Sequence, residues 1–182
     1  NFIYSKIDMP LIDVLSSMEN TGVRINEKYL NNLSTEFSKQ ITLLESKIYK
    51  ITKKEFNIGS PKQLGEILFD EMGIKGAKKT KTGSYSTDSS ILEELALDGE
   101  EIAKLILNWR ELSKLKSTYT DSLINQISTT TGRVHTSYAL ASTITGRLRN
   151  NDPKLQTIPI RTEIGKKIRK AFIPKKDNKL YI

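Results

Sequence analysis

Metal-dependent catalysis in this 182-residue chain would depend on its acidic residues. Phosphoryl transfer with two metal ions requires carboxylates that converge closely, usually from the ends of strands. The acids within residues 88–101 fall on and between predicted helices, in the pattern of a solvated surface. The C-terminal third contains only Asp152, Glu163 and Asp177, which are scattered, and no nucleophile stands beside a base. The residues themselves therefore predict a binding protein with no catalytic and no metal-binding residues.

His135 is the single histidine, and the chain contains no cysteine. A metal site could therefore combine this imidazole only with carboxylates, and a structural hydrogen bond on a predicted strand is favoured over a metal or acid–base role. The lack of cysteine excludes disulfides and fits a reducing compartment. No apolar run approaches the roughly 20 residues that span a bilayer, and the N-terminus lacks a signal-peptide core. We therefore expect a cytoplasmic protein without a membrane partner.

A lysine-rich segment at residues 73–87, "GIKGAKKTKTGSYST", could bind phosphate. It imitates a P-loop, but Lys78 stands where that motif requires the glycine that lets the backbone wrap around a phosphate. Because it has no apolar period, the segment predicts a flexible loop. Its lysines either grip a polyanion backbone or simply keep the loop soluble. They are Lys75, Lys78, Lys79 and Lys81.

Three hydroxyl residues precede predicted helices. Ser60, Ser86 and Thr87 stand where side-chain hydroxyls and free backbone N–H groups can bind phosphate. Helix capping alone would explain the same residues equally well.

The positive charge is concentrated at the C-terminal end. The chain has a formal net charge of +8, and residues 129–182 contain twelve Lys and Arg against three Asp and Glu. The stretch "TGRLRNNDPKLQTIP", residues 145–159, is typical of this region. Such asymmetry indicates a polyanion partner, since basic side chains release counterions from phosphates. A solvated basic surface is the alternative.

Hydrophobic periodicity predicts a mainly helical, α+β fold. Apolar residues recur every three or four positions in residues 26–51 and 100–127, the first of which would form a helix about 40 Å long. Two long helices with shorter ones between them predict an elongated helical arm. Shorter helices are expected over residues 11–21, 61–68 and 88–95, and strands over 134–138, 168–173 and 179–182.

Capping residues are expected at the ends of several helices. Gly22 is placed to end the first helix, and Asn26 to begin the first long one. Ser60, followed by Pro61 and Gln63, has the spacing of a capping box. Ser86 and Thr87 are the candidate caps of the short helix that follows the lysine-rich segment.

Several segments, in this order along the chain, resemble the polymerase domain of family A DNA polymerases of the bacterial DNA polymerase I type. The resemblance runs from about Met9 to the C-terminus, and several matching segments span eight or more residues. They are "MENTGVRIN", "FNIGSPKQLGEILFDEMGIK", "KKTKTGSYST", "LNWRELSKLKSTYTDSL", "TGRVHTSYALASTITGRL", "DPKLQTIP" and "IGKKIRKAF".

The resemblance implies a division of the chain. Residues 1–9 would be a linker from a preceding domain, and residues 10–128 the thumb, with a tip loop at about 72–87. Residues 129–182 would be the N-terminal part of the palm, truncated before the catalytic motifs. The missing initiator Met and the apolar last residues likewise lead us to expect a piece of a longer protein.

The resemblance also implies a function. The complete enzyme would extend a primer 3′-OH with dNTPs in DNA replication and repair, using two Mg²⁺ ions, whereas this fragment would hold a primer–template duplex and be inactive on its own. It would need no cofactor, and dNTP would be a partner only of the complete enzyme. The alternative is a stand-alone helical module that binds nucleic acid or a protein.

Roles of individual residues follow by resemblance. Arg147 would lie in the minor groove at the primer terminus, where it donates to purine N3 or pyrimidine O2, acceptors that all four bases present. Gln156 would lie close to the template strand, and Lys81 at the thumb tip. Arg110, Lys114 and Tyr119 would share one face of the long helix. The full DNA-binding set is Ser60, Lys78, Lys79, Lys81, Ser86, Thr87, Arg110, Lys114, Tyr119, Arg147, Arg149, Lys154 and Gln156.

Five positions depart from the family pattern. Arg149 and Asn150 stand where the family usually has two serines, and Lys154 and Thr157 where it usually has asparagines. Leu140 also replaces a commonly polar residue. We expect the added charges to strengthen nonspecific binding at the cost of some hydrogen bonds in the minor groove.

Overall fold

The computed structural model describes residues 2–81 and 83–174. The chain divides into two compact units, one formed by residues 35–116 and the other by residues 1–34 together with 117–182. The fold is mainly helical with a few short antiparallel strands, which confirms the predicted fold class. Within the described residues, no helix is both long and apolar enough to cross a membrane.

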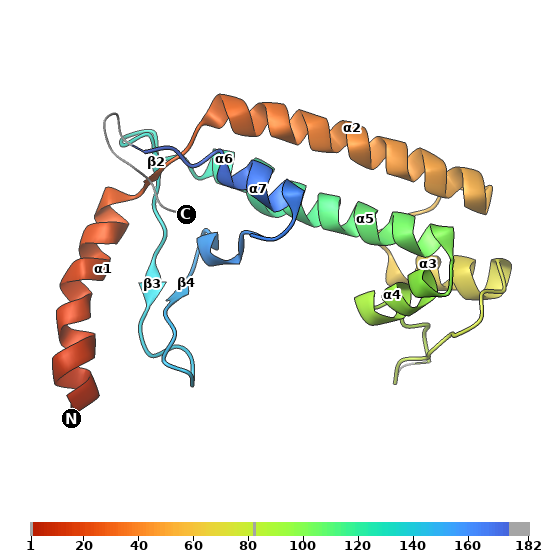
Figure 1. Ribbon diagram of the computed structural model, residues 1–182, viewed down its shortest axis with the longest axis horizontal. Coiled ribbons are helices and arrows are strands. Elements are labelled where there is room, and N and C mark those ends of the chain that lie inside the picture. The colour runs from red at the N-terminus through yellow and green to blue at the C-terminus, as the bar shows by residue number, and fades with distance from the viewer. Residues whose placement is uncertain (1, 82, 175–182) are drawn as a thin grey trace. The chain divides into compact units, whose positions relative to one another are not determined.

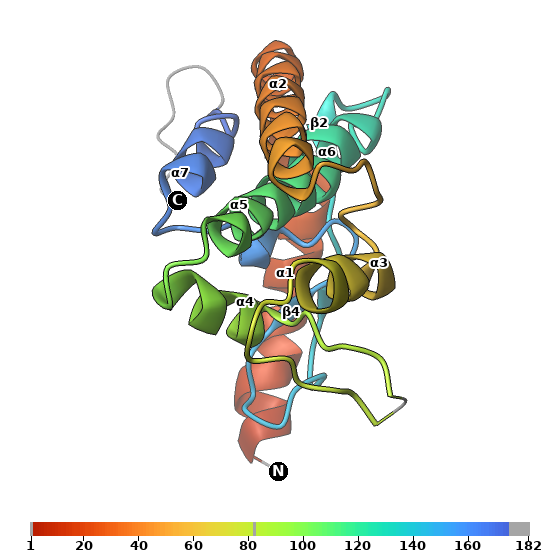
Figure 2. The same ribbon diagram turned by 90° about the vertical axis from the view of Figure 1, so that its right-hand side faces the viewer.

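The unit of residues 35–116 is built from helices. Figure 1 and Figure 2 both place α3 and α4 on one side of α5, and the C-terminal half of α2 on the other. A π-helical segment follows α3 directly. The bounds are Glu27–Thr52 for α2, Pro61–Gly65 for α3, Glu66–Glu71 for the π-helical segment, Ser89–Leu97 for α4 and Glu101–Leu115 for α5.

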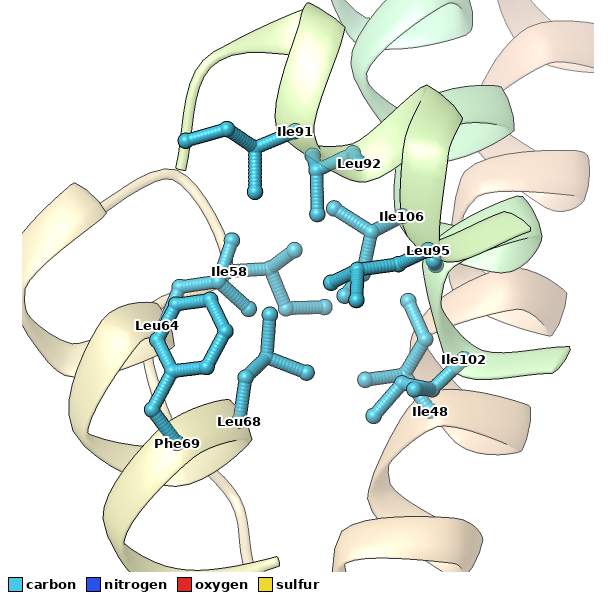
Figure 3. Close-up of a cluster of buried hydrophobic side chains, with 11 residues drawn as sticks. Ile48, Ile58, Leu64, Leu68, Phe69, Ile91, Leu92, Leu95, Ile102 and Ile106 are labelled. Carbon is cyan, nitrogen blue, oxygen red and sulfur yellow. The ribbon is translucent and has the colours of Figure 1, made fainter. Parts of the chain in front are cut away.

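The core of this unit lies where these helices meet (Figure 3). Leu68, Leu92 and Ile106 come from three different elements and have no exposed surface. Burying one aliphatic side chain of this size contributes about 1.5 to 3 kcal/mol relative to leaving it exposed. The cluster comprises Ile48, Ile58, Leu64, Leu68, Phe69, Ile91, Leu92, Leu95, Ile102, Ala103 and Ile106.

Three predicted caps are confirmed. The Asn26 side chain accepts from the N–H of Tyr29 at 3.0 Å, and Gly22 ends α1 with a φ of 62°. The Ser60 hydroxyl accepts from the N–H of Gln63 at 3.5 Å. The reciprocal half of the capping box is wrong, because the Ser60 N–H already donates to the carbonyl of Asn57. The Gln63 side chain accepts from the N–H of Asn57 instead, at 2.8 Å.

The predicted single helix over residues 100–127 is interrupted. After α5, residues Lys116–Asp121 form a π-helical turn, and α6 continues over Ser122–Asn125. A π-helical turn shifts the register of the buried stripe. The consecutive residues Tyr119 and Thr120 are both buried in this turn.

The unit that contains residues 117–174 carries the short strands. A π-helical segment leads into α1, and the loop between β3 and β4 extends well beyond its two strands (Figure 1). The predicted strand 134–138 is divided between two antiparallel ladders, in which Val23 pairs with Val134 and Tyr138 with Asn150. The bounds are Tyr4–Asp8 for the π-helical segment, Met9–Thr21 for α1, Val23–Arg24 for β1, Arg133–Val134 for β2, Tyr138–Ala139 for β3 and Arg149–Asn150 for β4.

The predicted strand over residues 168–173 is wrong. Ile168 lies in α7 (Glu163–Arg169), after a short 3₁₀ turn at Leu155–Thr157. The hydroxyl of Thr162 caps α7 by accepting from the N–H of Gly165 at 3.1 Å. Only Phe172 makes a bridge to another strand-like segment, opposite Ile25. The predicted strand at residues 179–182 lies outside the described residues.

Candidate nucleic-acid interface

The lysine-rich segment forms a hairpin instead of the flexible loop that its composition predicted. We call its described residues, 78–81 and 83–86, the tip hairpin. The N–H of Ser86 donates to the carbonyl of Lys78 at 2.8 Å, and the N–H of Thr80 to that of Ser84 at 2.8 Å. Lys79 and Tyr85 face each other across this antiparallel pairing. Its basic side chains are thus attached to an ordered backbone.

The lysines of the tip hairpin differ in their surroundings. Lys78 forms an ion pair with Glu94 at 2.9 Å, in which both side chains are more than half exposed. The Nζ atom of Lys79 lies 5.4 Å from the centre of the Tyr85 ring, within the range of a cation–π contact. Lys81 is exposed. Because exposed ion pairs contribute at most about 1 kcal/mol, Glu94 does not prevent Lys78 from binding a phosphate.

Arg110 and Thr87, predicted from segments far apart in the sequence, are brought together. The guanidinium donates to both the carbonyl and the hydroxyl oxygen of Thr87, at 2.5 and 3.1 Å. Burial lowers the pKa of Arg110, and the nearby carboxylate of Asp88 opposes that shift. Thr87 is only 3% exposed. Its hydrogen bonds with Arg110 attach the end of the tip hairpin to α5.

The predicted cap of α4 is corrected at the same place. Asp88, with extended backbone angles, occupies the N-cap position, while the Ser86 hydroxyl donates to the Asp88 carboxylate at 2.7 Å. Thr87 cannot cap because Arg110 holds it in the interior. A groove of about 360 Å³ opens beside these residues, and its lining includes Thr80, Ser86 and Arg110.

The predicted common face of Arg110, Lys114 and Tyr119 is only partly found. Lys114 is exposed and borders a second groove of about 380 Å³ beside α4 and α5. Tyr119 is only 4% exposed, and its hydroxyl lies 2.9 Å from that of Thr157. Tyr119 follows the buried Leu115 by four residues, so it continues the buried stripe of the helix and contacts a neighbouring segment instead of facing solvent.

The β3–β4 hairpin presents one arginine from its loop and one from the start of β4 to solvent. Arg147 and Arg149 are both exposed. Gly146 precedes Arg147 with a φ of 69°, which a residue with a Cβ adopts poorly. The hydroxyl of Thr143 donates to the carbonyl of Arg147 at 2.9 Å. The backbone of the loop is therefore fastened while the guanidinium is left exposed.

A buried amide beneath this loop was not predicted as part of the site. The side chain of Asn150 is 3% exposed and donates to the Pro153 carbonyl at 3.1 Å. Its backbone N–H donates to the side-chain oxygen of Gln156 at 2.9 Å, and the Gln156 amide donates to the Leu148 carbonyl at 3.2 Å. Asn150 and Gln156 thus hold the segments on either side of Asp152. The departure from the family pattern at Asn150 was the only sequence signal of this role.

Replacing Asn150 with alanine should destabilise the unit by about 1 to 3 kcal/mol, because the buried hydrogen bonds of its side chain to the Pro153 carbonyl and from the Gln156 N–H are lost. Urea denaturation would measure the loss in the free energy of unfolding. Asn151→Ala, an exposed neighbour, is the matched control and should change stability by less than about 0.5 kcal/mol. Equal losses in the two variants would contradict this role for Asn150.

Lys154 lies at the surface, whereas His135 is hydrogen-bonded within the protein. Lys154 is exposed, and its carbonyl accepts from the Thr157 hydroxyl at 3.3 Å. His135 makes the structural hydrogen bonds that were favoured for it, with its Nδ1 atom 2.7 Å from the Glu19 carbonyl and its Nε2 atom 2.7 Å from the Thr131 hydroxyl.

Magnesium ions do not fit the residues that the structure describes. No three His, Asp or Glu side chains within residues 2–81 and 83–174 are grouped so that they could hold a metal ion. We therefore derive no reaction step through a metal at this interface.

The chain resembles known DNA polymerases over almost all of its length. It is 49% identical over 178 residues to the DNA polymerase I of Rhizobium leguminosarum, which covers 98% of this chain and 18% of that protein. It is 45% identical over 173 residues to the thermostable DNA polymerase I of Thermus aquaticus, covering 94% and 21%. The chain thus spans about a fifth of the length of these relatives.

A solved structure agrees with the sequence matches. The POL domain of Pol1 from M. smegmatis, in complex with DNA primer-template and dNTP, superposes with a TM-score of 0.88 at 38% identity. The match covers 96% of this chain and 30% of that one. In addition, residues 27–182 match the family model described as DNA polymerase family A. The chain therefore belongs to DNA polymerase family A.

Proposed function

We propose that this chain is the DNA-holding part of a DNA-directed DNA polymerase that extends a primer 3′-OH with dNTPs. Residues 10–128 would act as the thumb and residues 129–182 as the first part of the palm. The proposal is carried by the likeness to a POL domain in complex with DNA primer-template, which extends over 96% of this chain. Two Mg²⁺ ions would serve nucleotidyl transfer in the whole enzyme, and we assign them no ligand among the described residues.

The exposed basic hairpins suit a duplex partner. Lys79 and Lys81 on the tip hairpin, Arg147 on the β3–β4 loop and Arg149 at the start of β4 present cations from hydrogen-bonded backbone. Phosphates are recognised by such charges without regard to sequence, and Arg147 adds a donor for acceptors that every base pair offers in the minor groove.

Other predicted residues would divide into two roles. Ser60, Ser86, Lys78, Lys114 and Lys154 lie at or near the surface and would contact DNA directly. Thr87 and Tyr119 are buried and would instead position the elements that carry the contacts. Arg110 and Gln156 would do both, since each binds protein oxygen atoms and still has further N–H groups.

A salt titration tests the proposal. We expect the chain to bind a primer–template duplex without sequence preference, with the logarithm of the association constant falling linearly with the logarithm of salt concentration. Fluorescence anisotropy on a labelled duplex would measure the slope. Lys81→Ala should reduce its magnitude by about one.

Lys54→Ala is the matched control, because Lys54 is an exposed lysine of the same unit that does not belong to the predicted DNA-binding set. Its slope should stay close to that of the unmodified chain. A binding constant independent of salt, or a strong preference for one sequence, would contradict the proposed function.

A further inference from the structure

One aromatic side chain attaches the tip hairpin to the rest of its unit. The hydroxyl of Tyr85 donates to the carboxylate of Asp70 at 2.5 Å. Its ring centroid lies 5.0 Å from that of Phe69, with the planes inclined by 44°. Both partners lie in the π-helical segment Glu66–Glu71. The hairpin is therefore attached by a hydrogen bond and a ring contact that point to the same short segment.

Gly65 provides the space for this attachment. A Cβ atom at Gly65 would lie 2.6 Å from the Cβ of Tyr85, closer than real contacts allow. Gly65 has ordinary helical backbone angles, so an alanine there would be favoured by the helix itself. The close approach of Tyr85, and not the backbone conformation, is what requires a glycine.

The same ring also orders a basic side chain. Lys79 lies opposite Tyr85 in the antiparallel pairing, with its Nζ atom 5.4 Å from the ring centre. A tyrosine hydroxyl is protonated at neutral pH in any case, and the hydrogen bond to Asp70 raises the pKa of Tyr85 further. A further side-chain link joins Lys78 and Glu94, and an exposed ion pair of this kind contributes little to stability.

We propose that Tyr85 is the positioning residue for the phosphate contact of the tip hairpin. By docking the hairpin on α3 and the π-helical segment, it presents Lys79, Lys81 and Ser86 as a set that is ordered before DNA arrives. A hairpin that is ordered before binding gives a higher affinity, because binding then does not include the free-energy cost of immobilising it. This inference rests on the proposed function.

The inference predicts a pattern that distinguishes positioning from direct contact. Tyr85→Ala and Gly65→Ala leave every charge in place, so the salt slope should keep its magnitude while affinity falls roughly tenfold at each salt concentration. Lys81→Ala, in contrast, changes the slope. Tyr85→Phe, which keeps the ring and loses only the hydroxyl, should have an intermediate effect.

Hydrogen exchange of the free chain tests the docking separately from DNA. The N–H groups of Thr80 and Ser86 donate within the hairpin, and their exchange should accelerate about tenfold or more in Tyr85→Ala and Gly65→Ala. Ser84→Ala, at an exposed position of the same hairpin, is the matched control and should behave like the unmodified chain. Circular dichroism would establish that all variants are folded.

Each outcome has a defined meaning. Unchanged exchange in both Tyr85→Ala and Gly65→Ala would overturn the docking role, whatever happens with DNA. Accelerated exchange with unchanged affinity would overturn the positioning role. If the unmodified chain bound no duplex at any salt concentration, the proposed function would fail and the role of Tyr85 in binding would fail with it, although the exchange data would still report the docking.

Discussion

Replacing Arg147 with alanine, in a polymerase that contains this chain, should slow single-turnover primer extension by roughly 10-fold to 150-fold at saturating DNA. A hydrogen bond from a charged donor contributes about 1.5 to 3 kcal/mol. If the whole of this contribution is made in the transition state, its loss raises the activation free energy by the same amount and gives this range of rates. Affinity for the duplex should fall much less, because many phosphate contacts remain.

The position proposed for Arg147, at the primer terminus, is the reason why we expect the effect to fall on the rate. The Thr143 hydroxyl holds the Arg147 carbonyl at 2.9 Å, so the side chain projects from a fastened backbone. A donor in the minor groove at the primer terminus aligns the 3′-OH, and an interaction that aligns the reacting group contributes mainly to the chemical step.

Lys81→Ala is the comparison. Lys81 belongs to the tip hairpin, so its loss should weaken binding and lower the salt slope, while the rate of the bound complex stays within about twofold. Rapid-quench measurement at saturating DNA separates rate from affinity. Equal single-turnover rates for Arg147→Ala and the unmodified enzyme would refute the assignment of Arg147.

Replacing Leu92 with alanine should destabilise the unit of residues 35–116 by about 2 to 5 kcal/mol. Leu92 has no exposed surface and packs in the cluster of Figure 3 with residues of α3, the π-helical segment and α5. Removing its side chain loses the free energy of transferring the missing methyl groups from water into the core. It also leaves a cavity that the neighbouring helices fill only in part. Urea denaturation would measure the change.

Leu97→Ala provides a control with the same change of residue in the same helix. Leu97 is the last residue of α4 and is 88% exposed, so its loss should change stability by less than about 0.5 kcal/mol. Similar losses at Leu92 and Leu97 would show that the cluster is not the core of this unit.

Several features of the candidate interface could be predicted from sequence because they depend on near neighbours. The caps at Gly22, Asn26 and Ser60 each involve residues within four positions along the chain. Helical spacing likewise identified the buried faces of α2 and α5. The exposed Arg147 also follows from a local pattern, a polar loop with a glycine that permits its turn.

One missed signal was local: Thr162 caps α7 by accepting from the N–H of Gly165, three residues further on. Other features needed contacts that no local pattern reveals. The tip hairpin has the composition of a flexible loop, yet Tyr85 docks it on a segment fifteen residues away. Thr87 looks like a cap until Arg110, twenty-three residues further on, binds it.

The sequence by itself therefore determined the family, the helical class and the basic surface of this protein, because short motifs, periodicity and charge are properties of neighbouring residues. Only the tertiary structure decided which of the predicted residues face solvent. Thr87, Tyr119 and Asn150 are buried polar residues, whose burial is costly unless they are hydrogen-bonded. Each has a partner in another segment, namely Arg110, Thr157 and Thr136. Those partners meet only when the chain has folded, so their role could not be derived from local sequence.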